Sequence, residues 1–353
     1  MRNRILTRLI VGLALLPGAA PATAAVTLRG IVPEDGPRTG WFERYQETRQ
    51  GPETVDKVTQ TFKVGAEGAL DLAGLSGDVR VTGGSGNEIK VEATKRVRHR
   101  DAGEARRLLN DLRVEMNNFN GRVEVRTAYP RRGAYDERGL VARVDYVIAV
   151  PAGASVSVKS ISGDIIVSGA RGEVRAETVS GDVDVSATPN VTVAKTVSGN
   201  VIARDIGGAT TLVLSTVSGS VIASGLRVRA LEAGSVSGDV KLSGMQVERV
   251  EARSMSGNIE FDAPFTRAGR YEFTSHSGNV RIVVSGSTGF ELDADTFSGS
   301  VRSDLPVTRR ALGREDRDRR GGAGNRAIRG SYGDASAILS VRSHSGSVVI
   351  TKK

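Results

Sequence analysis

One short motif recurs along most of this chain at nearly constant spacing. It reads Ser or Thr, an apolar residue, Ser, Gly, then Asp, Asn or Ser, then Val or Ile. Its second serine falls at Ser162, Ser180, Ser198, Ser218, Ser237, Ser256, Ser277, Ser298 and Ser345, with an outlying copy at Ser76. The intervals are 18 to 21 residues up to Ser298 and 47 residues for the last step. A fixed period of this length is typical of stacked-repeat folds.

The residues on both sides of the motif alternate between apolar and polar. Before Ser180, the apolar residues are Val174 and Ala176, and after Gly181 they are Val183 and Val185. A period of two predicts β-strands with one buried and one exposed face. Each repeat therefore predicts two short strands, a tight corner at Ser-Gly-Asx and a looser second corner.

These observations predict an all-β fold, namely a β-solenoid of about 19-residue two-strand rungs with an N-terminal strand-and-helix cap. A single unit cannot bury its apolar face, whereas stacked units bury it at about 4.8 Å per rung. The 43 glycines and the aromatic content of only 4% suit short strands joined by tight turns. An antiparallel sandwich also has short strands, but it does not require near-identical corners at constant spacing.

The segment VDYVIAVP, residues 144–151, is followed by VSVKSISGDI, residues 156–165. Together they resemble the start of the repeat region in the bacterial "putative adhesin" β-strand-repeat family, a domain of unknown function of the 4097 type. The resemblance covers roughly residues 54–353. It implies a β-solenoid in the cell envelope, and it supplies no catalytic residues.

The chain is expected to contain four regions. Residues 1–24 have the form of a secretory signal peptide, with three arginines before a short apolar run and the cleavage pattern Ala22-Thr23-Ala24. Residues 25–53 are expected to be a flexible arm, in which Trp41 either packs on the solenoid or docks on a partner. Residues 54–150 are expected to form the cap, and residues 151–353 the solenoid. We therefore expect export to the periplasm or cell surface, and no transmembrane span in the mature chain.

Within the cap, a helix is expected to begin at Asp101. Asp101 and Glu104 have the spacing of a capping box, and an apolar face follows. That face consists of Ala105, Leu108, Leu109 and Leu112. We expect the helix to cover an end or side of the sheet, because open strand edges invite aggregation. A partner-binding helix is the alternative.

An insertion rich in arginine and glycine is expected at about residues 304–333. Its core, Arg309–Arg320, has the composition of a flexible charged loop. It is either a solvated excursion or a cationic finger for anionic glycans or lipid headgroups. The formal net charge is +9, and three of these charges lie in residues 1–24, which leaves about +6 to favour anionic partners. Nucleic acid is not expected, since no nucleic-acid motif occurs.

No catalytic, cofactor-binding or metal-ligating residue is predicted. The chain has no cysteine, and it has no G-x-S-x-G elbow, P-loop or dinucleotide fingerprint. His276 and His344 both precede the repeat serine and are interpreted as variants of the repeat. A calcium ladder is not expected, because the third corner position mixes Asp with Asn and Ser. One weak ion between Asp164 and Asp182 is left open.

The expected function is that of an exported, non-catalytic, adhesin-like envelope protein that binds glycan, lipid headgroup or protein through its outer faces. The alternatives are a polysaccharide lyase or hydrolase, and a passive structural or stress-linked envelope component. Candidate carboxylates for an enzyme are Asp184, Glu232, Glu251, Glu260 and Glu272, which solvated strand faces also explain. Three or more outward carboxylates and basic residues in one groove would favour the enzyme. A flat side with scattered charges would favour binding.

Overall fold

A computed structural model describes residues 51–353, apart from residues 130–134, 137–138, 141, 209–210 and 310–325. All described residues belong to one compact unit within Gln46–Lys353. The expected signal peptide and nearly all of the expected arm, including Trp41, therefore lie outside the described residues.

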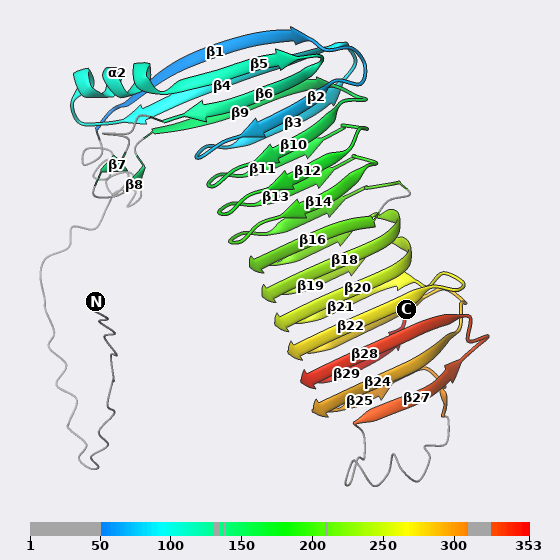
Figure 1. Ribbon diagram of the computed structural model, residues 1–353. Coiled ribbons are helices and arrows are strands. Elements are labelled where there is room, and N and C mark those ends of the chain that lie inside the picture. The colour runs from blue at the N-terminus through cyan, green and yellow to red at the C-terminus, as the bar shows by residue number, and fades with distance from the viewer. Residues whose placement is uncertain (1–50, 130–134, 137–138, 141, 209–210, 310–325) are drawn as a thin grey trace, which may run out of the picture. The chain divides into compact units, whose positions relative to one another are not determined.

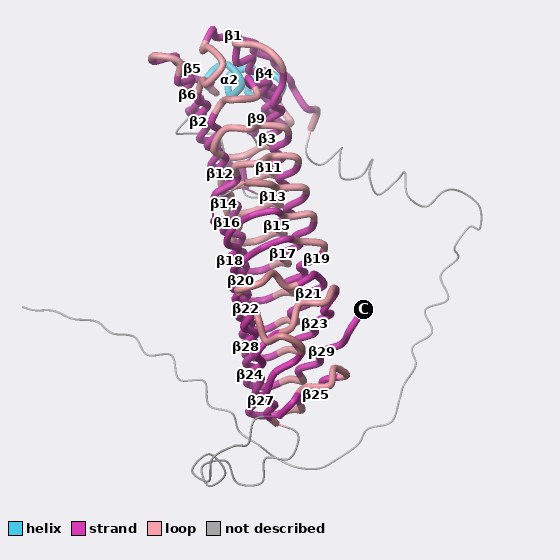
Figure 2. Tube along the Cα trace, turned by 90° about the vertical axis from the view of Figure 1, so that its right-hand side faces the viewer, coloured by secondary structure: helices cyan, strands magenta, loops and turns pink. Residues whose placement is uncertain are grey.

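Two long β-sheets face each other across a continuous apolar core (Figures 1 and 2). Sheet A contains, in spatial order, β1 (Glu53–Lys63), β4 (Glu88–Arg98), β9 (Ala142–Pro151), β3 (Val79–Gly84), β11 (Ile165–Ser168), β13 (Val183–Ser186), β15 (Val201–Arg204), β17 (Val221–Ser224), β19 (Val240–Ser243), β21 (Ile259–Pro264), β23 (Val280–Ser285), β29 (Val348–Lys352) and β25 (Val301–Ser303).

Sheet B contains, again in spatial order, β26 (Thr308–Arg309), β27 (Ala327–Tyr332), β24 (Phe290–Ser298), β28 (Ala337–Ser345), β22 (Arg270–Ser277), β20 (Gln246–Ser256), β18 (Arg227–Ser237), β16 (Thr211–Ser218), β14 (Val191–Lys195), β12 (Val174–Glu177), β10 (Ser155–Lys159), β2 (Ala69–Ala73), β6 (Arg122–Ala128) and β5 (Arg113–Phe119). The strands β7 (Tyr135–Asp136) and β8 (Gly139–Leu140) form a separate two-stranded sheet.

Each repeat forms one rung, with one strand in sheet B and the next in sheet A. Successive rungs pair in parallel register, so that Ser180 bridges Ser198 at the corner. Val183 and Val185 are fully buried, and Asp184 between them is partly exposed. The predicted β-solenoid and the predicted alternation of its strands are confirmed.

The first rung lies earlier in the chain than residue 151. Strands β2 and β3 pair in parallel with β10 and β11, and Ser76 bridges Ser162 in the same way as the later corner serines. The outlying copy of the motif is therefore a regular rung within the range assigned to the cap. Beyond it, β9, β4 and β1 extend sheet A, while β6 and β5 extend sheet B.

The helix α2 (Ala102–Asp111) begins where the sequence predicts it. The Asp101 carboxylate accepts a hydrogen bond from the Glu104 backbone N–H at 2.7 Å, and the four predicted apolar residues are buried. On β4, the Lys95 ammonium donates to the Leu109 carbonyl at 3.3 Å and pairs with Asp56 of β1 at 2.7 Å. The helix thus covers the cap strands β1 and β4. In the described part of the chain, no helix has the length and apolar character needed to span a membrane.

The C-terminal rung does not lie at the end of the stack. Strand β28 lies between β22 and β24 in sheet B, and β29 lies between β23 and β25 in sheet A. Figure 1 shows this rung in red between the yellow strand β22 and the orange strands β24 and β25. The last segment of the chain therefore fills a gap between two rungs that precede it in sequence.

Part of the expected charged loop is a strand. Residues 327–332 form β27, which pairs antiparallel with β24, and Arg329 binds Asp293 at 2.8 Å. The physical reason is that β24 belongs to the last rung, so its outer edge needs a partner strand. Ile328 is buried and fixes the inward face of β27. Of the expected core Arg309–Arg320, Arg309 ends β26, and residues 310–325 lie outside the described residues.

Candidate ligand-binding surface

The corner glycines are required by the close approach of successive rungs. Gly181 has a φ of +132°, a region that side-chain-bearing residues rarely occupy. A Cβ built on Gly181 would lie 2.3 Å from the carbonyl oxygen of Gly163. The glycine of the motif therefore serves the fold.

The Asx side chains of the corners bind the next rung. The Asp164 carboxylate accepts from the Asp182 N–H at 2.8 Å, and the Asp182 carboxylate accepts from the Asn200 N–H at 2.6 Å. The Asn200 amide oxygen accepts in turn from the Ser220 N–H at 3.0 Å. Asp and Asn interchange because either supplies the required oxygen. These bonds join rungs, rather than the local backbone groups that Asx residues bind in ordinary turns.

The Asp164–Asp182 pair, left open as an ion site, uses an Asp164 oxygen for this bond between rungs. Among the described residues, no group of three or more His, Asp or Glu side chains is arranged to hold a metal ion.

A second ladder uses the buried Ser or Thr two residues before the repeat serine. The Thr196 hydroxyl donates to the Gly181 carbonyl at 2.9 Å, and the Ser235 hydroxyl donates to the Gly219 carbonyl at 2.8 Å. Both side chains are buried. The hydroxyl, glycine and Asx positions of the motif are therefore occupied by bonds and contacts within the solenoid.

The residue directly before the repeat serine is exposed on the sheet B side of the corner. This position forms one row, which we call the apolar ladder. In spatial order it consists of Ile161, Val179, Val197, Val217, Val236, Met255, His276, His344 and Phe297. The aliphatic members and Met255 are 43–57% exposed, and Phe297 is 71% exposed. One exposed side chain per rung, about 4.8 Å apart, makes a continuous stripe.

The C-terminal end of the apolar ladder is a stack of parallel rings. The ring centroids of His276 and His344 are 4.7 Å apart with an interplanar angle of 2°. Those of His344 and Phe297 are 4.9 Å apart at 3°. Because the rings cover one another's faces, their edges are the exposed part. The two histidines are neighbours only because β28 lies beside β22.

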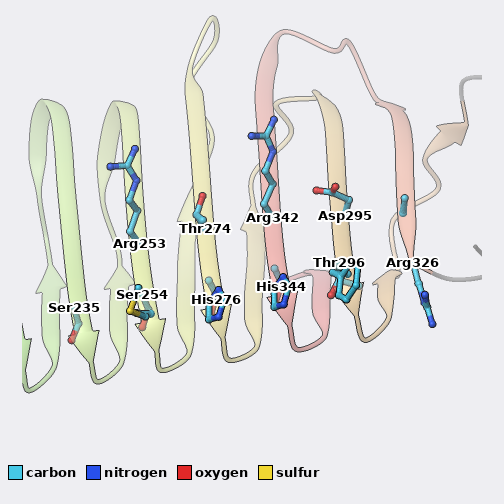
Figure 3. A pocket seen from close by; sticks show the side chains of 15 residues that line it. Ser235, Arg253, Ser254, Thr274, His276, Asp295, Thr296, Arg326, Arg342 and His344 are labelled. Carbon is cyan, nitrogen blue, oxygen red and sulfur yellow. The ribbon is translucent and has the colours of Figure 1, made fainter. Parts of the chain in front are cut away.

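A hollow of about 760 Å³ opens beside this stack (Figure 3). Its lining includes Arg253, Thr274 and Arg342, which are in register on the adjacent strands β20, β22 and β28. Arg253 forms an ion pair with Glu251 of its own strand. The Arg342 side chain is exposed, and it forms no ion pair with any described residue.

Two further charged residues, Asp295 and Arg326, also line the hollow. Figure 3 shows Asp295 next to Arg342, and it shows Arg326 at the far end of the hollow. Asp295 is the one carboxylate among the described lining residues. A glycoside hydrolase uses a pair of carboxylates, so the described lining lacks half of that pair.

The five candidate carboxylates are not brought together. Glu232, Glu251 and Glu272 form a row across β18, β20 and β22 of sheet B. Asp184 and Glu260 belong to sheet A, and Asp184 binds Arg204 at 2.8 Å. The apolar core separates the two groups.

Sequence reasoning missed Thr274, Asp295 and Arg342 as surface candidates. All three stand three residues before a repeat serine, as Arg253 does. Aligning the repeats on their serines would have found this row. The contact between Arg342 and Thr274 required the position of β28, which the chain order does not give.

The fold and this surface define a β-solenoid whose repeat motif joins successive rungs and whose sheet B side carries the apolar ladder and the hollow. The family model described as Toastrack DUF4097 matches residues 141–351, and the chain belongs to this family.

Solved structures with some similarity include a "putative adhesin" from Bacteroides fragilis, with 12% identity, 84% of this chain and 97% of that chain covered, and a TM-score of 0.38. Another is a "putative lipid binding protein" from Parabacteroides distasonis, with 14% identity, 84% and 97% covered, and a TM-score of 0.39. Among curated proteins, none matches the chain.

Proposed function

We propose that the protein is an exported, non-catalytic envelope protein that binds its ligand on the outward face of sheet B. The observation that carries this proposal is the exposed apolar ladder, which ends in the hollow lined by Arg253, Arg342 and the two stacked histidines. A contiguous exposed apolar stripe beside a hollow that holds a few charged side chains is typical of a binding surface. The ligand classes are a glycan, a lipid headgroup or a protein.

Export rests on the form of residues 1–24. We expect the mature chain to begin at Ala25 and to fractionate with the periplasm or the cell surface. Cell fractionation, followed by mass spectrometry of the intact mature chain, tests this. A full-length chain recovered in the cytoplasm would contradict it.

One observation favours a polysaccharide lyase as a second candidate. The hollow gathers the carboxylate of Asp295 with Arg253, Arg342, His276 and His344, which meets the criterion set for an enzyme. A lyase needs a base to remove a proton and a cation to stabilise the charge that develops. Histidine and arginine are residue types that fill these roles.

A glycan array combined with an assay for released products separates the candidates. We expect the mature chain to bind at least one glycan without releasing unsaturated or hydrolysed fragments. Released fragments would support the enzyme. Absence of glycan, lipid and protein binding would leave the passive structural role.

A variant without Arg309–Arg320 tests the cationic-finger interpretation on the same array. If binding is unchanged, the arginine-rich insertion is not the binding element. If binding is lost, the insertion carries it, and the hollow is not sufficient.

A further inference from the structure

The geometry points to the hollow as an oxyanion site for an acidic polysaccharide. In this assignment, Arg253 and Arg342 bind the carboxylate or sulfate group of one sugar, while the sugar chain follows the apolar ladder. The inference rests on the proposed function and names the ligand class that the same surface takes.

The lining of the hollow is rich in hydrogen-bond donors. Arginine offers five N–H donors and no acceptor, and its planar fork matches a carboxylate or sulfate. The exposed edges of His276 and His344 add ring N–H groups, and Thr274 adds a hydroxyl. Such a set satisfies an oxyanion better than it satisfies a neutral sugar, whose hydroxyls also donate.

The spacing of the two arginines suits a single group held between them. Arg253 and Arg342 lie on either side of Thr274, two rungs apart, which is about 10 Å between backbones. Figure 3 shows both side chains extending from the same side of the strands. Each side chain is long enough to lean towards the threonine between them.

Arg253 and Arg342 differ in how far an ion pair neutralises their charge, and both can still bind an anionic ligand. Arg342 has no ion pair with a described residue, so its charge is not neutralised there. Arg253 pairs with Glu251 at an exposed site, where ion pairs are weak. A ligand carboxylate has to compete with this exposed partner and with the carboxylate of Asp295, which is in register with Arg342 on the neighbouring strand β24.

The rest of the face favours a polysaccharide chain over a membrane surface. Glu232, Glu251 and Glu272 form a row of carboxylates on the same sheet, parallel to the ladder. A flat anionic bilayer would have to cover this row, which would repel it, together with the exposed Arg249 and Arg270, which stand two residues before Glu251 and Glu272. A single polysaccharide chain is narrow enough to follow the ladder and reach the hollow without covering the row.

Titration calorimetry of the mature chain tests the inference with paired probes. The acidic probes are oligogalacturonate and dextran sulfate, and their neutral counterparts are methyl-esterified oligogalacturonate and dextran. We expect at least one acidic probe to bind and its neutral counterpart to bind much more weakly. Rising salt should weaken this binding, because the site is exposed.

The double variant Arg253→Gln with Arg342→Gln removes both guanidinium groups from exposed positions. We expect it to lose about tenfold or more in affinity, since hydrogen bonds to charged groups contribute strongly. The matched control is Arg281→Gln, an exposed arginine on the sheet A strand of the β22–β23 rung, and we expect no change. Unchanged melting temperatures show that all variants are folded.

Several results would overturn the inference and can be told apart from failure of the proposed function. Equal binding of acidic and neutral probes, or an unchanged affinity in the double variant, rejects the oxyanion site but leaves a binding protein. Binding only to phosphatidylglycerol vesicles rejects the glycan and favours a lipid headgroup. Absence of binding to every probe, the vesicles and the glycan array rejects both proposals.

Discussion

At the scale of the residue, the repeat motif is a set of connections between rungs. Gly181 allows the rungs to approach, the Asp182 carboxylate holds the next backbone N–H, and the Thr196 hydroxyl holds the Gly181 carbonyl. These bonds satisfy backbone groups that would otherwise be left unpaired at the corner. The repeat serine and the residue before it are the exceptions, because both are exposed in each rung from Ser162 on.

The first prediction concerns the corner glycine. Gly181→Ala places a Cβ 2.3 Å from the Gly163 carbonyl oxygen at a φ of +132°, so we expect a loss of about 2 kcal/mol or more in the free energy of unfolding. Urea denaturation measures it. The control is Gly234→Ala on the outward face, where the nearest atom is 3.7 Å away, and its expected change is within about 0.5 kcal/mol. Equal effects of the two substitutions would contradict this account of the corner.

The second prediction tests whether Asp182 acts through its hydrogen-bond acceptor, as a corner residue, or through its negative charge, as a charged site. Asp182→Asn keeps an oxygen for the Asn200 N–H, so the free energy of unfolding should be nearly unchanged. Asp182→Ala removes the acceptor and should cost about 1–2 kcal/mol. Urea denaturation of both variants measures the difference. If Asn were as damaging as Ala, the negative charge itself would matter.

At the scale of the element, α2 is fixed by its first turn and by its apolar face. The backbone N–H of Glu104 donates to Asp101 and holds the pKa of that carboxyl below its usual range. In a complete capping box the Glu104 side chain would accept a hydrogen bond from the Asp101 backbone N–H. Here the Asp101 N–H donates to His99 Nδ1 instead, at 3.1 Å. The helix covers β1 and β4 of sheet A, as the sequence analysis expected.

The third prediction is the pH dependence of this cap. Because the folded pKa of Asp101 is lowered, its contribution to stability is present above the ordinary pKa of about 3.9 and is lost as the pH falls through the folded value. Asp101→Ala should therefore lower the melting temperature at neutral pH, and the difference from the unaltered chain should shrink below about pH 4. Thermal melts across pH 2–7 measure it. A difference that is constant over this range would contradict the assignment.

The C-terminal rung is the element on which the end of the stack depends. Strand β28 contacts β22 on one side and β24 on the other, and Val341 in its centre is fully buried. In a solenoid each rung is stabilised mainly by its neighbours. Loss of β28 should therefore detach β24 and β27 without unfolding the rungs near β12.

The fourth prediction follows from this arrangement. Val341→Pro removes a ladder hydrogen bond in the middle of sheet B, and the carbonyl left without a partner should cost about 1–3 kcal/mol locally. Amide hydrogen exchange should then show lost protection in β24, β27 and β28, with protection retained in β12 and β14. Uniform loss of protection along the solenoid would show that the rungs do not behave as separate neighbours.

At the scale of the whole molecule, the periodic part of the fold was predictable and the order at its end was not. The spacing of the serines and the alternation around Val183 and Val185 follow directly from strand geometry. The position of β28 between β22 and β24 depends on contacts between strands that are far apart in the sequence. That is a property of the assembled sheets and has no local signal in the sequence.

The candidate site, like the fold, could be predicted from the sequence only in part. Reading the position before each repeat serine gives the apolar ladder, and reading three residues before it gives Arg253, Thr274 and Arg342. Chain order, however, places Phe297 between His276 and His344. Only the inserted rung makes the histidines adjacent and brings Arg342 beside Thr274. Composition also predicted a loop at residues 327–332, where the open edge of β24 recruits a strand.

We propose that ligand binding takes place on the outward face of sheet B, at the hollow, and that the Ser-Gly-Asx corners serve the fold. Amide hydrogen exchange of the mature chain, with and without oligogalacturonate, tests it most directly. We expect added protection in β20, β22 and β28 around Arg253, Thr274 and Arg342, and none at the corners from Ser162 to Asn200. Added protection at those corners, or on the sheet A strands around Arg281, would contradict it.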